Sequence, residues 1–187
     1  MSGVVLLQKG AERLVYYPSF FSQDLFVPLQ DQLNWQQNEI VIFGKKYLEP
    51  RLTAWYGLPY QYSSIQWPQQ DFVPVLDEVK KRLESELSFS FNSVLANFYR
   101  DGIDAMGWHR DNEKEMDQRI IASVSLGAER IFKVKSRITS EKLDVKLESG
   151  SLLVMENFQT NWMHAIPRSK KIAEPRINLT FRRIIPR

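Results

Sequence analysis

The chain contains no cysteine and only two histidines among its 187 residues. The absence of cysteine excludes disulfide bonds, thiolate zinc sites, iron–sulfur clusters and a cysteine nucleophile. A bound metal would therefore take histidine, carboxylate, carbonyl or water ligands. The sequence also lacks an apolar run long enough to span a membrane, and its start, MSGVVLLQKG, has too short an apolar core for a signal peptide. We therefore expect an intracellular protein that does not enter a membrane.

Repeats, low-complexity segments and domain linkers are absent as well. A chain of this length with 43% hydrophobic residues predicts a single domain spanning 1–187. The charge is nearly balanced, with 25 Lys and Arg against 22 Asp and Glu and a formal net charge of +3. This balance permits a polyanionic partner but does not by itself indicate one.

Hydrophobic periodicity predicts one clear helix and many short strands. In residues 73–87, Leu76, Val79, Leu83 and Leu87 recur at helical spacing opposite charged positions. Residues 38–67 contain β-branched and aromatic runs broken by Gly and Pro, which indicate extended segments and a hairpin. Further strands are predicted near 89–99, 120–126, 129–136, 143–148, 151–156, 162–166 and 176–184. This order favours an α+β protein whose sandwich or barrel-like β core is supported by an N-terminal helix.

The segment PRINLTFRR alternates polar and apolar residues. Because alternate residues of a strand face the same side, two arginines, an amide and a hydroxyl share one face: Arg176, Asn178, Thr180 and Arg182. The same rule places Asn97 and Tyr99 on one face of an earlier strand. Such a polar face serves either solvent, as on an edge strand, or a bound anion.

The stretch GWHRDNE holds one of the two histidines. In an extended segment, His109 and Asp111 lie on the same face. Imidazole and carboxylate both bind divalent metals, and His164 would complete a two-histidine, one-carboxylate triad that leaves coordination positions open. Taken alone, a His-x-Asp sequence is more often a surface histidine beside an acid.

Four ordered elements together resemble the AlkB family of Fe(II)- and 2-oxoglutarate-dependent dioxygenases: NFY, HRD, the distant His164 and RINLTFR. The resemblance covers about residues 40–184 and implies a double-stranded β-helix, or jelly roll, over about residues 89–187. It implies that His109, Asp111 and His164 hold Fe(II), with O2 as second co-substrate. It also implies that six residues bind 2-oxoglutarate, namely Asn97, Tyr99, Arg176, Asn178, Thr180 and Arg182. The sequence leaves open which arginine takes which carboxylate.

The resemblance also implies a nucleotide-recognition region of hairpins over about residues 40–70. Phe43 before Gly44 resembles a wedge that replaces a flipped base, with Lys45 and Lys46 meeting phosphates and Arg51 near the lesion or the backbone. The alternative is that residues 40–43 are a buried strand.

Tyr60 and Tyr62 share a face and resemble a base-stacking pair, and packing within the hairpin is the alternative. Directly after the metal carboxylate, Asn112 and Glu113 would read the exocyclic amine of the base. Some relatives carry acids at both positions, so Glu113 fits this role better than Asn112.

The function implied is oxidative removal of N-alkyl groups such as those of 1-methyladenine and 3-methylcytosine in DNA, a direct repair reaction that releases formaldehyde. Alternatives are RNA demethylation, protein hydroxylation or demethylation, and a non-catalytic nucleic-acid-binding jelly roll. We expect a monomer that binds alkylated DNA. Its location would be the cytoplasm of a bacterium or the nucleus of a eukaryote.

Overall fold

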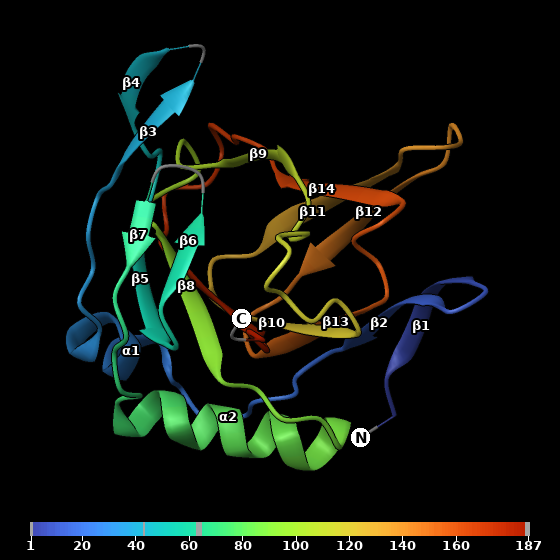
Figure 1. Cartoon of the computed structure of the whole chain (residues 1–187), viewed down its shortest axis with the longest axis horizontal. Helices are drawn as coiled ribbons and strands as arrows, with labels where there is room; N and C mark the ends of the chain where they lie inside the picture. Colours follow the sequence, from blue (N-terminus) through green and yellow to red (C-terminus); the bar gives the residue numbers. More distant parts are fainter. Residues whose placement is uncertain (1, 43, 63–64, 186–187) are drawn as a thin grey trace.

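Two antiparallel β-sheets face each other in the computed structural model, which describes residues 2–42, 44–62 and 65–185 (Figure 1). The larger sheet has, in spatial order, β1 (Val4–Lys9), β2 (Glu12–Tyr17), β13 (Ser151–Glu156), β10 (Ile120–Gly127), β15 (Arg176–Arg182), β8 (Ser93–Tyr99) and β5 (Leu52–Gly57). The smaller sheet has β12 (Lys142–Leu147), β11 (Arg130–Ser136), β14 (Trp162–Ile166) and β9 (Met106–His109). This arrangement confirms the predicted jelly-roll core.

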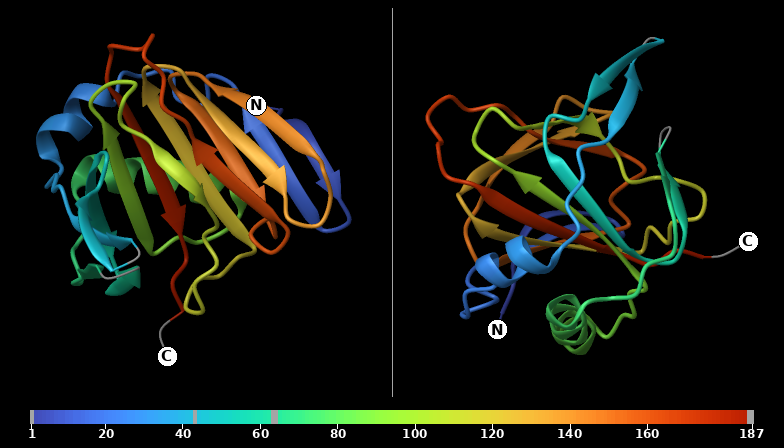
Figure 2. Two further views of the ribbon diagram at one scale, coloured as in Figure 1. Left: turned by 90° about the horizontal axis from the view of Figure 1, so that it is seen from above. Right: turned by 90° about the vertical axis from the view of Figure 1, so that its left-hand side faces the viewer.

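Two hairpins and two helices complete the described elements. The hairpins are β3 (Glu39–Ile42) with β4 (Lys45–Leu48), and β6 (Tyr60–Tyr62) with β7 (Ile65–Trp67); the helices are α1 (Phe26–Gln32) and α2 (Pro74–Leu87). The β3–β4 hairpin projects away from the sheets, on the side remote from α2 (Figures 1 and 2). None of the described helices is long and apolar enough to cross a membrane.

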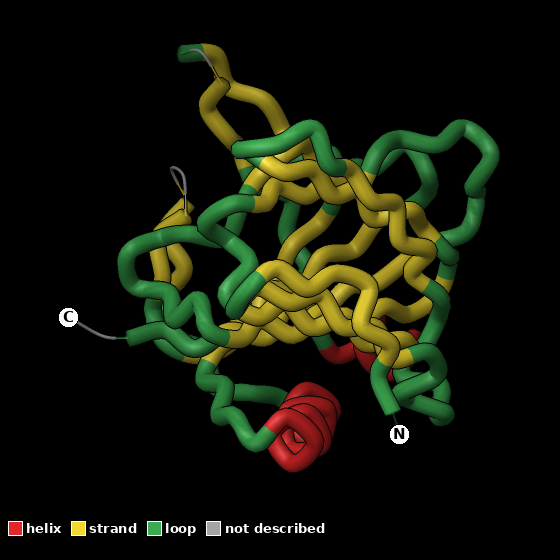
Figure 3. The backbone as a smooth tube through the Cα atoms, turned by 90° about the vertical axis from the view of Figure 1, so that its right-hand side faces the viewer, coloured by secondary structure: helices red, strands yellow, loops and turns green. Residues whose placement is uncertain are grey.

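Helix α2 covers the outer face of the larger sheet, as the tube view also shows (Figure 3). It begins at Pro74, whose fixed φ suits the first turn, and ends at Leu87; its C-cap residue, Ser88, adopts the left-handed conformation. Its apolar stripe contributes Leu76, Val79 and Leu83, each fully buried, to the core cluster beneath the sheet. The helix predicted over residues 73–87 is confirmed.

Strand β15 lies in the middle of the larger sheet, between β10 and β8. Its apolar residues Ile177, Leu179 and Phe181 pack in the helix-side core. Its polar residues therefore point toward the space between the sheets, and both faces of the strand are buried. The interpretation of this segment as an edge strand with a solvated face is wrong.

The structure differs from the sequence-based expectation mainly at the N-terminus. Residues 4–17 form the β1–β2 hairpin, which extends the larger sheet at its edge, and α1 follows it. Neither was predicted. Strand β8 begins at Ser93 rather than near 89, and β15 ends at Arg182 rather than near 184. Within the expected hairpin region, β5 belongs to the larger sheet, where it pairs with β8.

Candidate active site

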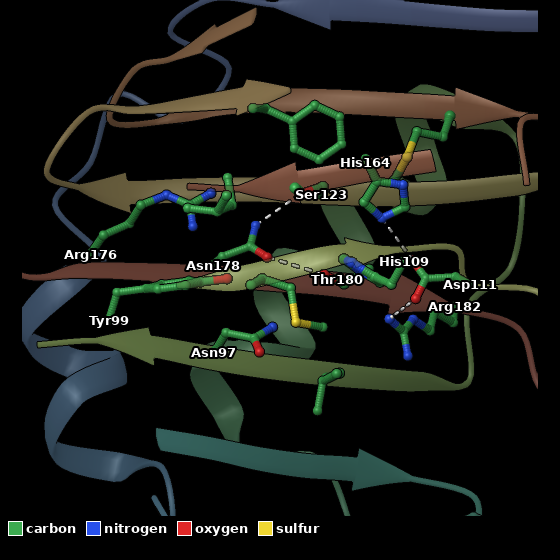
Figure 4. Close-up of a pocket in the computed structure, with 16 residues that line it drawn as sticks. Asn97, Tyr99, His109, Asp111, Ser123, His164, Arg176, Asn178, Thr180 and Arg182 are labelled. Carbon is green, nitrogen blue, oxygen red and sulfur yellow. Dashed lines mark hydrogen bonds and ion pairs between the residues drawn. The ribbon is translucent and has the colours of Figure 1, made fainter. Parts of the chain in front are cut away.

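A cavity between the two sheets is lined by side chains from both (Figure 4). The larger sheet supplies its polar floor through β8, β10 and β15, and the smaller sheet supplies the opposite wall through β9, β11 and β14. The predicted metal and co-substrate residues all line this cavity: Asn97, Tyr99, His109, Asp111, His164, Arg176, Asn178, Thr180 and Arg182. The topology thus brings together residues that are up to 85 positions apart in the chain, from Asn97 to Arg182.

The two histidines meet because β9 and β14 are neighbours, with His109 directly opposite His164. Asp111 follows β9 and is only 3% exposed. One ligand atom from each of the three residues lies within 4.8 Å of the others, and His164 Nε2 is 3.7 Å from Asp111 Oδ2. Two imidazoles and one carboxylate in this arrangement match the donor set of non-haem Fe(II) oxygenases. The residues present therefore fit Fe(II).

Hydrogen bonding fixes the tautomer of His109. Its Nδ1 lies 2.8 Å from the carbonyl oxygen of Gly107, which can only accept, so Nδ1 carries the proton and Nε2 keeps its lone pair for a metal. Burial of the imidazole lowers the pKa of His109 to about 4, and the neighbouring His164 contributes to this shift. The His109 ring is therefore neutral near pH 7, as a metal ligand must be.

Asp111 is held ionised by its neighbours. Its burial alone would raise the pKa, but Arg182 and His164 outweigh that effect and keep the pKa well below its usual range. Arg182 Nη2 donates to Asp111 Oδ1 over 2.7 Å. The backbone N–H of Asp111 donates to Gln159 Oε1 over 3.0 Å, and Gln159 is fully buried.

Gln159 is a site residue that the sequence analysis missed. Besides holding the backbone of Asp111, its amide nitrogen donates to Met155 Sδ over 3.5 Å. It lies 48 residues after Asp111 and belongs to no predicted strand, so the sequence offered no spacing signal for it.

Arg176 lies at the opposite end of the cavity from the metal-binding residues (Figure 4). It is 1% exposed, and its Nη2 donates to Ser125 Oγ over 2.9 Å. Its Nε and Nη1 have no hydrogen-bond partner among the described residues. Burial lowers the pKa of Arg176 to about 10, so the group remains charged near neutral pH. A buried cation with free donors requires an anion, and a carboxylate fits its planar fork.

Neutral polar groups line the floor between the two arginines. Asn178 Nδ2 donates to Ser123 Oγ and to the carbonyl of Val124, over 2.8 and 2.9 Å. Thr180 Oγ1 donates to Asn178 Oδ1 over 3.2 Å. These bonds fix the side chains before any ligand arrives, which lowers the entropic cost of binding.

Arg51 is buried and paired within the chain. Its side chain is 4% exposed, with Nη2 2.9 Å from Glu49 Oε1 and Nε 2.7 Å from Asn97 Oδ1. Glu49 is itself buried and accepts a hydrogen bond from Thr53. Arg51 therefore orients Asn97, which lines the cavity.

Beside the metal-binding residues lies a pair of polar side chains, Tyr60 and Glu113. They interact with each other through a hydrogen bond between the phenol and the carboxylate. The ring of Tyr60 is 6% exposed and stacks on Trp55, with centroids 4.7 Å apart. Burial raises the pKa of Glu113, and the charge of Asp111 adds to the effect. Asn112 is exposed.

The β3–β4 hairpin is not a buried strand. Val41, Tyr47 and Leu48 are each about half exposed, at 47%, 49% and 58%. Gly44 has a φ of +75°, in the left-handed region that glycine adopts readily. Lys45 and Lys46 are exposed, and Lys46 forms a 3.0 Å ion pair with Glu39. Phe43 lies outside the described residues, as does the side chain of Tyr62.

Comparisons with known proteins agree with this site. The family model of the 2OG-Fe(II) oxygenase superfamily matches residues 13–182. "Alpha-ketoglutarate-dependent dioxygenase alkB homolog 3" of Mus musculus is 36% identical over 200 residues, which cover 98% of this chain and 70% of the relative. "DNA oxidative demethylase ALKBH2" of Mus musculus is 41% identical over 161 residues, covering 79% of this chain and 67% of the relative. A solved structure described as "The structure of OsALKBH1" shares the fold, with a TM-score of 0.69 at 17% identity, over 95% of this chain and 99% of that one.

Proposed function

The chain belongs to the 2OG-Fe(II) oxygenase superfamily, and from this premise we propose that it removes N-linked alkyl groups from nucleobases, with DNA as substrate. Two findings support the proposal: one similar relative is named a DNA oxidative demethylase, and the cavity has a buried polar rim beside the metal site. The proposal rests mainly on the buried Tyr60–Glu113 pair beside Asp111. The carboxylate of Glu113 interacts with Tyr60 and lies near Asp111 and Arg182, so it offers a hydrogen-bond acceptor close to the metal-binding residues.

His109, Asp111 and His164 would hold Fe(II). When bound, Fe(II) and 2-oxoglutarate supply the oxidation of an N-methyl group by O2, which ends in succinate, carbon dioxide, formaldehyde and the free base. The chain's own task is to place the three ligands, which it does through the β9–β14 pairing and through Arg182 and Gln159 on Asp111.

The two arginines of β15 would take opposite ends of 2-oxoglutarate. Arg182 lies at the metal end, bonded to Asp111, and Arg176 lies at the far end with free donors. We therefore assign the carboxylate remote from the metal to Arg176, with Tyr99 beside it. Asn97, Asn178 and Thr180 form the neutral wall between them.

The substrate base would enter next to Glu113 and Tyr60. A carboxylate oxygen is an acceptor and suits the exocyclic amine of adenine or cytosine, whose ring nitrogen carries the alkyl group in 1-methyladenine and 3-methylcytosine. A base inside a duplex must leave the stack to reach a cavity between two sheets. We assign to the β3–β4 hairpin, and to Phe43, Gly44 and Lys45, the task of filling the gap and meeting phosphates.

The test is turnover of methylated oligonucleotides by purified protein supplied with Fe(II), 2-oxoglutarate and O2. We expect succinate and formaldehyde in equal amounts from 1-methyladenine and 3-methylcytosine substrates, and no product from the His109→Ala variant. Single-stranded and double-stranded DNA and RNA are compared, with Phe43→Ala beside the unaltered protein. If Phe43→Ala loses activity on duplex DNA only, the result supports the wedge role of Phe43. Turnover of 2-oxoglutarate without demethylation of any nucleic acid would overturn the proposal.

The proposed substrate also implies where and in what form the protein acts. DNA repair requires an intracellular location, in the cytoplasm of a bacterium or the nucleus of a eukaryote. We also propose that the protein acts as a monomer. Light scattering of the purified protein measures the mass of the species in solution, and a dimer at assay concentration would contradict this part.

A further inference from the structure

Arg130, the first residue of β11, is a second buried arginine close to the co-substrate end of the cavity. It is 2% exposed. Its Nη2 donates to the carbonyl oxygens of Pro167, Asp104 and Gly102, over 2.7, 2.9 and 3.4 Å, and its Nη1 donates to that of Asp101 over 3.2 Å. Arg130 thereby joins the loop that precedes β9 to the end of β14. These are the two strands that carry His109 and His164.

The guanidinium of Arg130 also lies over the ring of Tyr99, with Cζ 5.4 Å from the ring centroid. Arg176 Cζ lies 5.1 Å from the same centroid. Two buried guanidiniums therefore share one phenol ring. Arg130 donates to backbone carbonyls, and Arg176 interacts with a serine hydroxyl and with Tyr99; none of these partners is a carboxylate.

Like charges held close together in a protein interior repel each other, and each also loses solvation. The charges of Asp101 and Asp104 offset that of Arg130 in part, but Asp104 is already paired with Arg100, so two guanidiniums share that carboxylate. An anion bound to Arg176 would interact favourably with both cations. The positive charges of Arg130 and Arg176 are therefore better neutralised when a carboxylate is bound than when the cavity is empty.

We propose that Arg130 is a positioning residue for 2-oxoglutarate, which makes the far end of the cavity selective for a co-substrate with a second carboxylate. It acts without touching the ligand, since the four carbonyls engage its terminal nitrogens. Its charge attracts the remote carboxylate, its cation–π contact holds the ring of Tyr99, and its hydrogen bonds hold the adjoining loop. The inference rests on the co-substrate roles proposed above for Arg176 and Tyr99.

The experiment compares two ligands of equal length on the Mn(II)-loaded protein, which binds them without turnover. 2-Oxoglutarate carries the second carboxylate, and 2-oxopentanoate has a methyl group in its place. Calorimetry measures both dissociation constants for the unaltered protein, Arg130→Met and Arg130→Lys. We expect Arg130→Met to weaken 2-oxoglutarate about tenfold, as for unit charges roughly 10 Å apart at an effective dielectric constant of about 20. The dissociation constant of 2-oxopentanoate should change by less than about twofold.

Arg100→Gln is the matched control. Arg100 braces the same loop through Asp104, with 2.8 Å bonds to both carboxylate oxygens, but its side chain is 45% exposed. Loosening the loop in this way should leave the ligand selectivity unchanged. Equal weakening of both ligands by Arg130→Met, or the same selectivity change in Arg100→Gln, would show that Arg130 only supports the loop and would overturn the proposal.

Arg130→Lys and one further variant, Arg176→Met, keep the test decisive. If Arg130→Met does not fold, Arg130→Lys decides, because lysine keeps the charge but cannot bridge the same four carbonyls. We then expect a smaller loss for 2-oxoglutarate alone, and no selective loss would overturn the proposal. Arg176→Met tests the premise separately. If Arg176→Met leaves the preference for 2-oxoglutarate over 2-oxopentanoate unchanged, the assignment of the remote carboxylate to Arg176 is wrong. If Arg176→Met lowers this preference and Arg130→Met does not, only the role proposed for Arg130 is refuted.

Discussion

Gln159 offers the sharpest test of how the chain holds its metal-binding carboxylate. The side chain is fully buried, accepts the backbone N–H of Asp111 over 3.0 Å and donates to Met155 Sδ. Gln159→Leu keeps most of the volume but removes the acceptor. The N–H of Asp111 is then buried without a partner, which costs about 1–3 kcal/mol. For a protein of this size, each kcal/mol lowers the melting temperature by about 2–4 °C.

Gln159→Leu should also weaken metal binding. Asp111 would lose its backbone anchor while keeping Arg182, so its carboxylate would be less well placed. Removal of such supporting contacts typically lowers metal affinity by about 10–100-fold. Titration calorimetry with Mn(II) measures this loss, and circular dichroism measures the melting temperature.

A control variant separates the two effects. Asn92 also exchanges two side-chain hydrogen bonds with the backbone of one residue, Ile184, at 2.7 Å each, but it lies outside the cavity lining. Asn92→Leu should lower the melting temperature and leave the Mn(II) affinity unchanged. If Gln159→Leu melts earlier yet binds Mn(II) as tightly as the unaltered protein, the supporting role argued for Gln159 is refuted.

Three other outcomes follow from the described contacts. Glu113→Leu should lower kcat/KM for a methylated oligonucleotide by about tenfold or more, since it removes the acceptor for the exocyclic amine, while Mn(II) affinity stays unchanged in calorimetry. Arg176→Met should weaken 2-oxoglutarate by about 10–100-fold, because a charge-assisted bidentate contact is lost, and unchanged binding would exclude Arg176 as the carboxylate site. Finally, burial opposes ionisation of Asp104, but Arg100 outweighs this and lowers the pKa of Asp104. The ionised Asp104 therefore stabilises the fold above the unfolded-state pKa near 3.8, and this stabilisation is lost as the pH falls through the lower folded-state pKa. In Asp104→Asn, the melting temperature should not show this decrease at acid pH.

Strand β15, with the residues that we propose to bind the co-substrate, could be predicted from sequence because its pattern is local. Alternation in RINLTFR separates the two faces without any knowledge of neighbours, and the structure confirms both faces. Local alternation does not predict what the polar face contacts. Whether Arg176 meets solvent or a cavity depends on β11 and β14, which lie across from it in the other sheet.

The missed elements have weak local signals. Helix α1 has seven residues with a proline inside, and its N-cap residue, Leu25, makes no side-chain capping bond. The β1–β2 hairpin is stabilised by pairing with β13, more than 130 residues later. Arg51, Arg130 and Gln159 act through contacts 26 to 48 residues apart, such as that between Arg51 and Asn97. No periodicity or spacing rule reports such contacts.

The two arginines of β15 illustrate how position in the cavity divides one pattern into two functions. Both are almost fully buried and share a strand face, yet Arg182 is matched by a carboxylate of the chain and Arg176 is not. Arg182 therefore stabilises the ionised Asp111, so Arg182→Met should weaken Mn(II) binding. Arg176→Met should leave Mn(II) binding unchanged and weaken 2-oxoglutarate instead. Calorimetry on both variants with both ligands separates the roles, and equal losses of Mn(II) affinity would contradict this division.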